Sequence, residues 1–226
     1  MAKGKLIIIE AGDGSGKATQ TKALYEHLLR DGQKVHKVEF PDYEADGSML
    51  VRMYLRGDFG GHAEDVNAYA ASTFFAADRY ASYRTKWQKY YEAGDIILAD
   101  RYTTSNMVHQ AVKLINPEER EAFLDWLWDY EFKKLGLPVP DLVIFLDMEP
   151  EAADRLIAQR AAVTGQSDIH EKDKAYLHRC HGAYLELAEK YGWQKVKCSQ
   201  KGEPRPVEEI HADVYEIVKK KLGAEN

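Results

Sequence analysis

The sequence predicts an α/β fold in which a parallel sheet of five strands lies between layers of helices. Short apolar runs alternate along the chain with longer stretches of helical pattern, which is the order found around parallel sheets. Most of these runs are apolar at consecutive positions, as expected for strands buried on both faces. No repeat, linker or shift in composition divides the 226 residues. We therefore expect a single domain over residues 1–226.

The predicted elements follow one another in a regular order. Strands are expected at residues 6–9, 35–40, 96–99 and 142–146, with residues 193–198 as a weaker fifth candidate. Helices are expected at residues 18–30, 65–93, 117–134, 152–160, 173–191 and 207–222. Right-handed crossovers would bury the sheet and place ligands at the carboxyl ends of its strands. Functional residues should therefore follow the strands directly.

The charge balance argues against several classes of partner. The formal net charge is -6, whereas general nucleic-acid or membrane-surface binders normally carry a basic excess. The apolar run near the N-terminus is short and ends in a glutamate, and no later stretch is long enough to span a bilayer. Cys180 and Cys198 lack metal-ligand spacing and form no disulfide framework. The sequence therefore predicts a cytoplasmic protein with ordinary thiols, bound to neither nucleic acid nor membrane.

A glycine-rich segment, EAGDGSGKATQ, follows the first predicted strand and leads into a helix. Glycines at 12, 14 and 16 would let successive backbone N–H groups converge on an anion, and the helix N-terminus adds partial positive charge. Lys17 would then reach the β- and γ-phosphates of a nucleotide. The alternative is a glycine-rich turn without a ligand, but that would leave Lys17 unexplained. The segment therefore predicts a phosphate-binding loop.

Two positions depart from the strict phosphate-loop pattern. Ala11 stands at the first glycine and Ala18 at the hydroxyl residue after the lysine. Alanine at 11 is acceptable where φ is negative, and water can replace a hydroxyl on Mg²⁺, which keeps several waters in any case. Thr19 offers a hydroxyl one residue later. The departures are therefore compatible with a phosphate-binding loop, but they do not decide which groups would bind Mg²⁺.

The third predicted strand ends in Asp100, Arg101 and Tyr102. An aspartate at this edge can hold Mg²⁺ through water, and an arginine can clamp a phosphoryl group with two parallel hydrogen bonds. A structural ion pair is the alternative. The phosphate loop on another strand favours the functional interpretation.

The predicted helix 65–93 carries Phe75 and Arg79 four residues apart, on one face. Aromatic residues at helical spacing usually belong to a core. An arginine beside an aromatic ring can also hold a flat base that has carbonyl groups at its edge.

The segment 161–172 consists mainly of small, polar and charged residues and has no regular pattern, so it is either a surface loop or a mobile lid.

These motifs, in this order, resemble the thymidylate kinase family of P-loop nucleoside monophosphate kinases. The resemblance covers nearly the whole chain: E-x-x-DG-x-GK-x-TQ at the start, FP after the second strand, F-x-x-x-R, DRY after the third strand, and PDLVIFLD before the lid. It implies transfer of the γ-phosphoryl group of ATP to dTMP, with Mg²⁺, in a homodimer with a lid at about 161–172.

The resemblance also implies residue roles. The ATP phosphates would lie on Gly12, Asp13, Gly14, Ser15, Gly16, Lys17, Ala18 and Thr19. In the acceptor nucleotide, Asp13 would contact the 3'-hydroxyl, Phe75 would stack on the base, Arg79 would bond its carbonyl edge and Arg101 would hold the phosphate. Phe40 and Leu55 would pack around the base and sugar, and Gln110 would line the base pocket. The catalytic residues would be Lys17, Asp100, Arg101 and Arg160, with Asp100 near Mg²⁺ through water.

Several positions differ from the family pattern. Tyr43 stands where many relatives have a phosphate-binding arginine, with Arg52 as the candidate substitute. Gly14 stands where some relatives carry a catalytic arginine, so a basic residue of the lid region would supply that charge. The candidates are Arg155, Arg160, Lys172 and Lys174, and Ile169 replaces the expected lid arginine.

The acceptor phosphate is already ionised near neutral pH, so no general base is assigned. Thymine would be preferred over uracil by only about 1–3 kcal/mol, the contribution of one methyl group.

Two alternatives to this kinase function stay open. A deoxynucleoside kinase would need a carboxylate base after the second strand, either Asp42 or Glu44. A nucleotide-binding regulatory protein without catalysis would bind ATP but form no product.

Overall fold

The computed structural model describes residues 3–164 and 173–223. Its central feature is a five-stranded sheet in the order β2-β3-β1-β4-β5, and every neighbouring pair is parallel. The strands are β1 (Lys5–Ala11), β2 (Val35–Glu39), β3 (Ile96–Asp100), β4 (Leu142–Asp147) and β5 (Gln194–Lys197). The predicted fold class is confirmed, including the weaker fifth strand.

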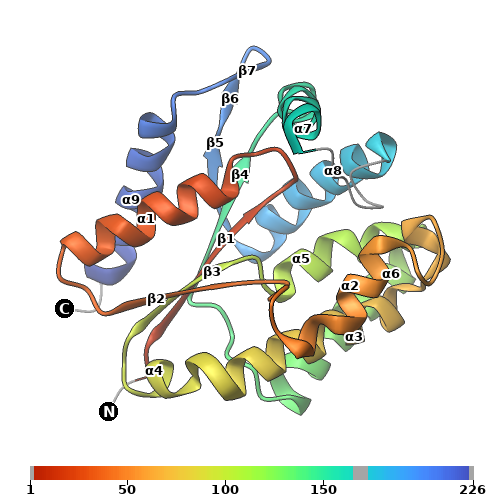
Figure 1. Ribbon diagram of the computed structural model, residues 1–226, viewed down its shortest axis with the longest axis horizontal. Coiled ribbons are helices and arrows are strands. Elements are labelled where there is room, and N and C mark those ends of the chain that lie inside the picture. Colours follow the sequence, from red (N-terminus) through yellow and green to blue (C-terminus); the bar gives the residue numbers. More distant parts are fainter. Residues whose placement is uncertain (1–2, 165–172, 224–226) are drawn as a thin grey trace.

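Helices cover both faces of this sheet, as the continuous apolar strands require (Figure 1). On one face Ile7 and Ile9 of β1 pack with Leu24 of α1 (Lys17–Arg30) and Val214 of α9 (Val207–Gly223). On the other face Leu6 and Ile8 pack with α5 (Thr103–His109), α6 (Pro117–Trp128) and α8 (Lys174–Tyr191). The remaining helices are α2 (Met49–Arg56), α3 (Ala68–Ser82), α4 (Gln88–Glu92) and α7 (Pro150–Thr164).

The long predicted helix 65–93 is interrupted in the structure. It begins at Ala68, where the Asn67 side chain caps the helix, and a π-helical turn at Tyr83–Trp87 separates α3 from α4. The predicted helix 117–134 likewise ends in a π-helical turn at Asp129–Lys134. A π-helical turn shifts which of the following side chains face inward. Helical periodicity in the sequence does not reveal such a turn.

Shorter elements complete the described chain. The helices α2 and α5 were not predicted, nor was the hairpin of β6 (Ser199–Gln200) and β7 (Glu203–Pro204). Short 3-10 turns lie at Asp46–Ser48, Ala63–Asp65 and Ala111–Lys113. Of the expected lid, 161–164 belong to the end of α7 and 165–172 lie outside the described residues.

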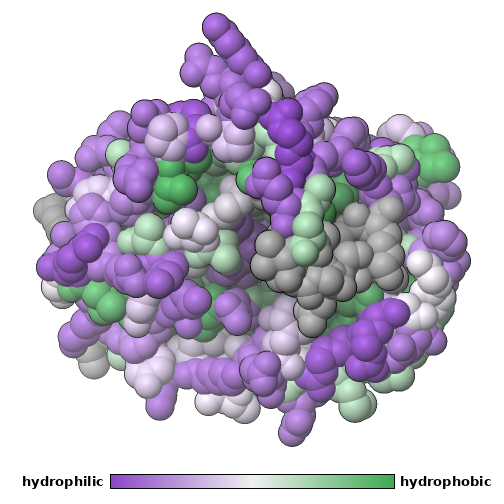
Figure 2. All heavy atoms as spheres, turned by 45° about the horizontal axis from the view of Figure 1, so that its top comes forward, coloured by the Kyte–Doolittle hydropathy of each residue, from purple (hydrophilic) through white to green (hydrophobic). Residues whose placement is uncertain are grey.

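The described helices include none long and apolar enough to cross a bilayer. The face drawn in Figure 2 is mostly hydrophilic, and its hydrophobic atoms are scattered in small separate areas. This surface agrees with the acidic, charged composition of the sequence.

Candidate active site

The glycine-rich segment forms a tight loop between the end of β1 at Ala11 and the start of α1 at Lys17. Gly14 and Gly16 adopt left-handed backbone conformations with φ of 76° and 74°. Residues with a Cβ atom rarely adopt this conformation. The Ser15 hydroxyl donates to the Gly12 carbonyl at 2.8 Å and braces the turn. The loop thus leads directly into a helix N-terminus, the usual geometry of an anion site.

Gly14 lies directly beneath α7. A Cβ atom at this position would be 2.6 Å from the Ala153 carbonyl oxygen and 2.8 Å from Cγ1 of Ile157. Both contacts are far closer than packed atoms tolerate. The backbone here therefore has no room for a side chain at residue 14 unless α7 shifts, so positive charge for the transferred group has to come from elsewhere than this point of the loop.

Lys17 reaches across from α1 to form an ion pair with Asp100 at the end of β3. Both side chains are largely buried. Burial, and then the positive charge of Arg101, lower the pKa of Lys17 to about 7, although the carboxylates of Glu10, Asp13 and Glu39 oppose this shift. A polyphosphate on the loop would restore favourable negative charge around this amine.

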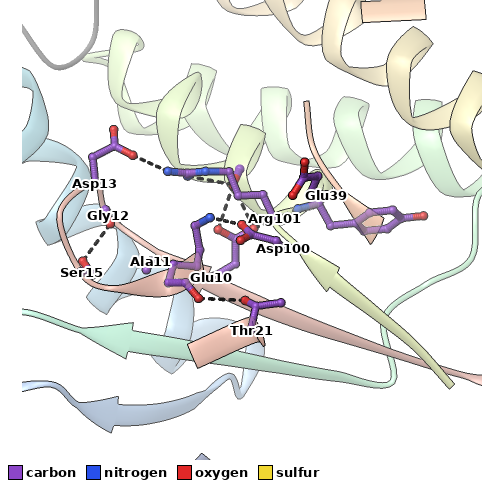
Figure 3. Close-up of polar contacts among 12 residues, drawn as sticks. Glu10, Ala11, Gly12, Asp13, Ser15, Thr21, Glu39, Asp100 and Arg101 are labelled. Atoms are coloured by element: carbon purple, nitrogen blue, oxygen red, sulfur yellow. Dashed lines mark hydrogen bonds and ion pairs between the residues drawn. The ribbon is translucent and has the colours of Figure 1, made fainter. Parts of the chain in front are cut away.

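Arg101 follows Asp100 and has an uncommon positive φ of 67°. Its Nη2 donates to Oδ1 of Asp13 at 2.5 Å, so the two side chains point toward one another across the loop (Figure 3). Burial lowers the pKa of Arg101, but Asp13, Tyr184 and Glu10 outweigh burial and raise it overall. Arg101 is therefore a permanently charged group held between the phosphate loop and β3.

Glu10 fixes the segment that carries Arg101. This fully buried carboxylate accepts from the Tyr102 backbone N–H at 3.2 Å, from Ser105 Oγ at 2.8 Å and from the Tyr184 hydroxyl at 3.1 Å. It was not predicted as a site residue. Its sequence signal was a single acidic residue next to a run of isoleucines, which is costly to bury unless it is fully hydrogen-bonded.

One cavity of about 330 Å³ opens beside the phosphate loop. Its walls include every residue predicted to bind the acceptor nucleotide, namely Asp13, Phe40, Leu55, Phe75, Arg79, Arg101 and Gln110. Lys17 and Asp100 also line it, together with residues that were not predicted, which include Glu39, Asn106 and His109. The sheet edge and the helices α2, α3 and α5 thus bring the scattered motifs to one place.

The inner end of the cavity carries paired and unpaired polar groups. Arg79 is 1% exposed and forms hydrogen bonds with both carboxylate oxygens of Glu131. Its Nη1 also donates to Oδ1 of Asn106 at 3.2 Å. The amide nitrogen of Asn106 and the amide oxygen of Gln110 are buried and have no hydrogen-bond partner among the described residues. A bound ligand that supplies an acceptor and a donor would satisfy them.

Other predicted residues lie away from this cavity. Ala18 and Thr19 are exposed on the first turn of α1. Arg52 donates to the backbone carbonyls of Tyr43 at 2.6 Å and Ala45 at 2.9 Å, so it braces a loop. Tyr43 itself lines the cavity.

The candidate basic residues near the lid divide into two groups. Arg155 bonds to the Gly202 carbonyl of the β6–β7 hairpin, and Lys174 lies 3.6 Å from Asp154. The Arg160 side chain and Lys172 lie outside the described part of the structure. Neither Asp42 nor Glu44 lines the acceptor cavity, and Asp42 forms an ion pair with Lys86.

The carboxylates beside the loop suit a magnesium ion that is held mainly by water and nucleotide. Among the described residues, no group of three or more His, Cys, Asp or Glu side chains could hold a metal by itself. Asp13, Glu39 and Asp100 nevertheless line the cavity. Mg²⁺ in such sites is typically bound through one or two carboxylates and the phosphates, with water in the other positions. The donor set fits this arrangement.

Comparisons with known proteins give a consistent result. A family model described as thymidylate kinase matches residues 9–214. The chain is 33% identical to the thymidylate kinase of Leifsonia xyli subsp. xyli over 93% of this chain and 92% of that protein. It is 32% identical to the thymidylate kinase of Mycobacterium tuberculosis over 83% of this chain and 87% of that protein. It is also 27% identical to a probable thymidylate kinase of Thermococcus gammatolerans, over 97% and 98% respectively.

Proposed function

This chain belongs to the thymidylate kinase family, and we propose that its cavity holds dTMP facing the phosphate loop, where the phosphates of ATP lie. The protein is an ATP-dependent nucleoside monophosphate kinase that forms dTDP and ADP. The observation that carries the residue assignment is that every predicted acceptor residue lines the same cavity as Lys17 and Asp100.

Phosphoryl transfer requires alignment of the attacking and leaving oxygens and positive charge around the transferred group. In the proposal, the loop N–H groups and Lys17 hold the β- and γ-phosphates of ATP. Arg101 holds the phosphate of dTMP on the side opposite Lys17. The ion pair of Arg101 with Asp13 fixes the position of the guanidinium group relative to the loop. The two phosphates thus meet between α1 and β3.

Mg²⁺ is proposed to bind near Asp100 through water, where it would neutralise charge on the phosphate oxygens. The chain contributes the carboxylate and its position. The Lys17–Asp100 ion pair already orients this carboxylate toward the loop.

The base end of the cavity supports recognition of thymine. Phe75, Phe40 and Leu55 supply apolar wall for a flat ring with a methyl group. Within residues 3–164 and 173–223, the buried amide nitrogen of Asn106 is a donor without a partner, and the amide oxygen of Gln110 is an acceptor without one. Thymine presents a carbonyl oxygen and an adjacent N–H at its edge, which match these groups.

The family resemblance supports further proposals about assembly and location. A homodimer is favoured by the exposed apolar side chains of α2 and α3, such as Met49, Leu50, Tyr69 and Tyr80. A cytoplasmic location agrees with the two buried free cysteines. The chain would form one kinase domain with a lid at about 161–172, and Arg160 at the base of that lid would supply positive charge to the transferred group.

The two alternatives predict different products. A deoxynucleoside kinase needs a carboxylate base beside the acceptor hydroxyl, but neither of the predicted bases, Asp42 and Glu44, lines the cavity. A non-catalytic regulatory protein would bind ATP without forming dTDP. Assays of dTMP and thymidine in parallel, with Mg²⁺ varied, separate all three. Phosphorylation of thymidine alone would contradict the proposal, and so would ATP binding without product at any Mg²⁺ concentration.

A further inference from the structure

Glu131 is a fully buried carboxylate that lies behind the acceptor cavity. It belongs to the π-helical turn Asp129–Lys134 that follows α6, and it is 0% exposed. Its Oε2 accepts from Arg79 Nε and from Thr103 Oγ1, each at 2.7 Å, and its Oε1 accepts from Arg79 Nη2 at 2.5 Å. Glu131 does not line the cavity. Any effect on a ligand must therefore pass through the residues that it holds.

Arg79 is the residue held most tightly. The guanidinium group is planar and rigid, so two hydrogen bonds to one carboxylate fix the direction of all its N–H groups. Nη1 consequently points at Asn106, where it donates to Oδ1 at 3.2 Å. A buried arginine without this carboxylate would be an uncompensated charge. The position of Arg79 in the cavity wall is thus set by Glu131.

The direction of the Asn106 amide follows from the same chain of contacts. An arginine has only donors, so Asn106 must present its oxygen to Arg79. Its amide nitrogen is then left as a buried donor without a partner among the described residues. Asn106 lines the cavity. The polarity of this part of the wall is therefore determined by contacts that begin at Glu131.

We propose that Glu131 is a positioning residue for base selection: by fixing Arg79, and through it Asn106, it makes the inner wall of the cavity a donor surface that accepts the keto edge of a pyrimidine. This inference rests on the proposed binding of dTMP in the cavity. Thymine and uracil present a carbonyl oxygen and an N–H at this edge. Cytosine presents an amino group and a bare ring nitrogen, so its amino group would face donors and its nitrogen would face the buried Gln110 oxygen.

The test compares three nucleotides on Glu131→Gln. Glutamine has nearly the same shape, but its amide nitrogen would face a donor of Arg79 and the negative charge is lost. Dissociation constants of dTMP, dUMP and dCMP are measured by calorimetry or by competition. Because dUMP and dCMP differ only at the edge, their ratio reports edge selection. Because dTMP and dUMP differ only in the methyl group, their ratio reports the apolar wall.

We expect Glu131→Gln to lower the preference for dUMP over dCMP by at least about tenfold, while the preference for dTMP over dUMP and the KM for ATP stay within about twofold. Thr103→Val removes one hydrogen bond from the same carboxylate and should shift the same ratio by a smaller factor, about two- to fivefold. Glu121→Gln is the matched control, because Glu121 lies on α6 but forms an exposed ion pair with Lys190. It should leave both ratios unchanged.

A purely structural role for Glu131 predicts that affinity for all three nucleotides falls together. A dUMP to dCMP ratio equal to that of the wild type in folded Glu131→Gln would overturn the inference, as would a wild type that does not discriminate between them. If Glu131→Gln does not fold, an unchanged ratio in Thr103→Val overturns it. Failure of the wild type to bind dTMP at all would instead contradict the proposed function.

Discussion

Arg101 and Asp13 form an ion pair, with Nη2 of the arginine 2.5 Å from Oδ1 of the aspartate. This contact joins the phosphate loop to the end of β3. It therefore links the loop proposed to bind the phosphates of ATP to the arginine proposed to bind the phosphate of dTMP. The Arg101 side chain also lies near Ser105, His109 and Tyr184. Its position is therefore fixed before a nucleotide binds.

Substitution of Arg101 by lysine should reduce kcat/KM for dTMP by about 100-fold, since lysine lacks the planar fork that holds a phosphate with two hydrogen bonds. Steady-state kinetics with each substrate varied in turn provide the measurement. Arg52→Ala is the comparison, because Arg52 binds loop carbonyls. It should lower thermal stability but change the KM for dTMP less than threefold. A tenfold rise in that KM would place Arg52 at the phosphate.

Substitution of Lys17 by methionine should lower kcat by on the order of 10²–10³ with the fold intact, because it removes the charged donor proposed for the transferred phosphoryl group. Circular dichroism and single-turnover kinetics check both parts. Unchanged single-turnover rates would remove the loop lysine from the mechanism.

Gly14 and Gly16 form a matched pair for the contact between the loop and α7. Both have positive φ, but only at Gly14 would a Cβ meet another atom closely, the Ala153 carbonyl at 2.6 Å. Gly16→Ala should lower the free energy of unfolding by about 1–2 kcal/mol, the cost of the left-handed conformation. Gly14→Ala should cost roughly 1–3 kcal/mol more, from overpacking. Urea unfolding without nucleotide measures the difference, and equal losses would show that α7 does not constrain the loop.

His211 provides a prediction about pH. It lies on α9 and faces α1, where its Nε2 is 2.9 Å from Nδ1 of His27. Burial, followed by the charges of His27 and Arg30, lowers the pKa of His211 below its ordinary 6.5. The unfolded chain therefore takes up a proton at this histidine at higher pH than the folded one. Stability is retained above pH 6.5 and is lost as the pH falls from there through the lower folded pKa.

The measurement for His211 is the melting temperature at pH 7.5 and 5.5. The wild type should lose about 1–3 °C more between these values than His211→Gln does, because glutamine cannot be protonated. Parallel losses in the two proteins would show that protonation of His211 is not linked to unfolding.

Much of the fold was predictable from single elements of the sequence. Consecutive apolar residues in β1 predicted a strand buried on both faces, and the structure places Ile7 and Ile8 in different cores on its two sides. The glycines and Lys17 predicted the loop because their chemistry is local. The short helices α2 and α5 were missed because they are only 8 and 7 residues long, so each offers too few positions for a helical repeat to stand out from a short apolar run.

The parts of the site that were missed depend on distant contacts. Glu131 meets Arg79 across 52 positions of the chain, and Glu10 meets Ser105 across 95. A buried carboxylate is recognised only when its partners are known, and no local pattern supplies them. Arg79 was predicted to bind the nucleobase, and the structure places it in the cavity wall, but the partner that fixes its direction, Glu131, could not be found without the structure.

The most direct test of the account is the product formed from ATP and dTMP by the purified protein in the presence of Mg²⁺. Anion-exchange chromatography should show dTDP and ADP accumulating in equal amounts, with thymidine left unchanged in a parallel reaction. Formation of ADP without dTDP, or conversion of thymidine but not of dTMP, would contradict it.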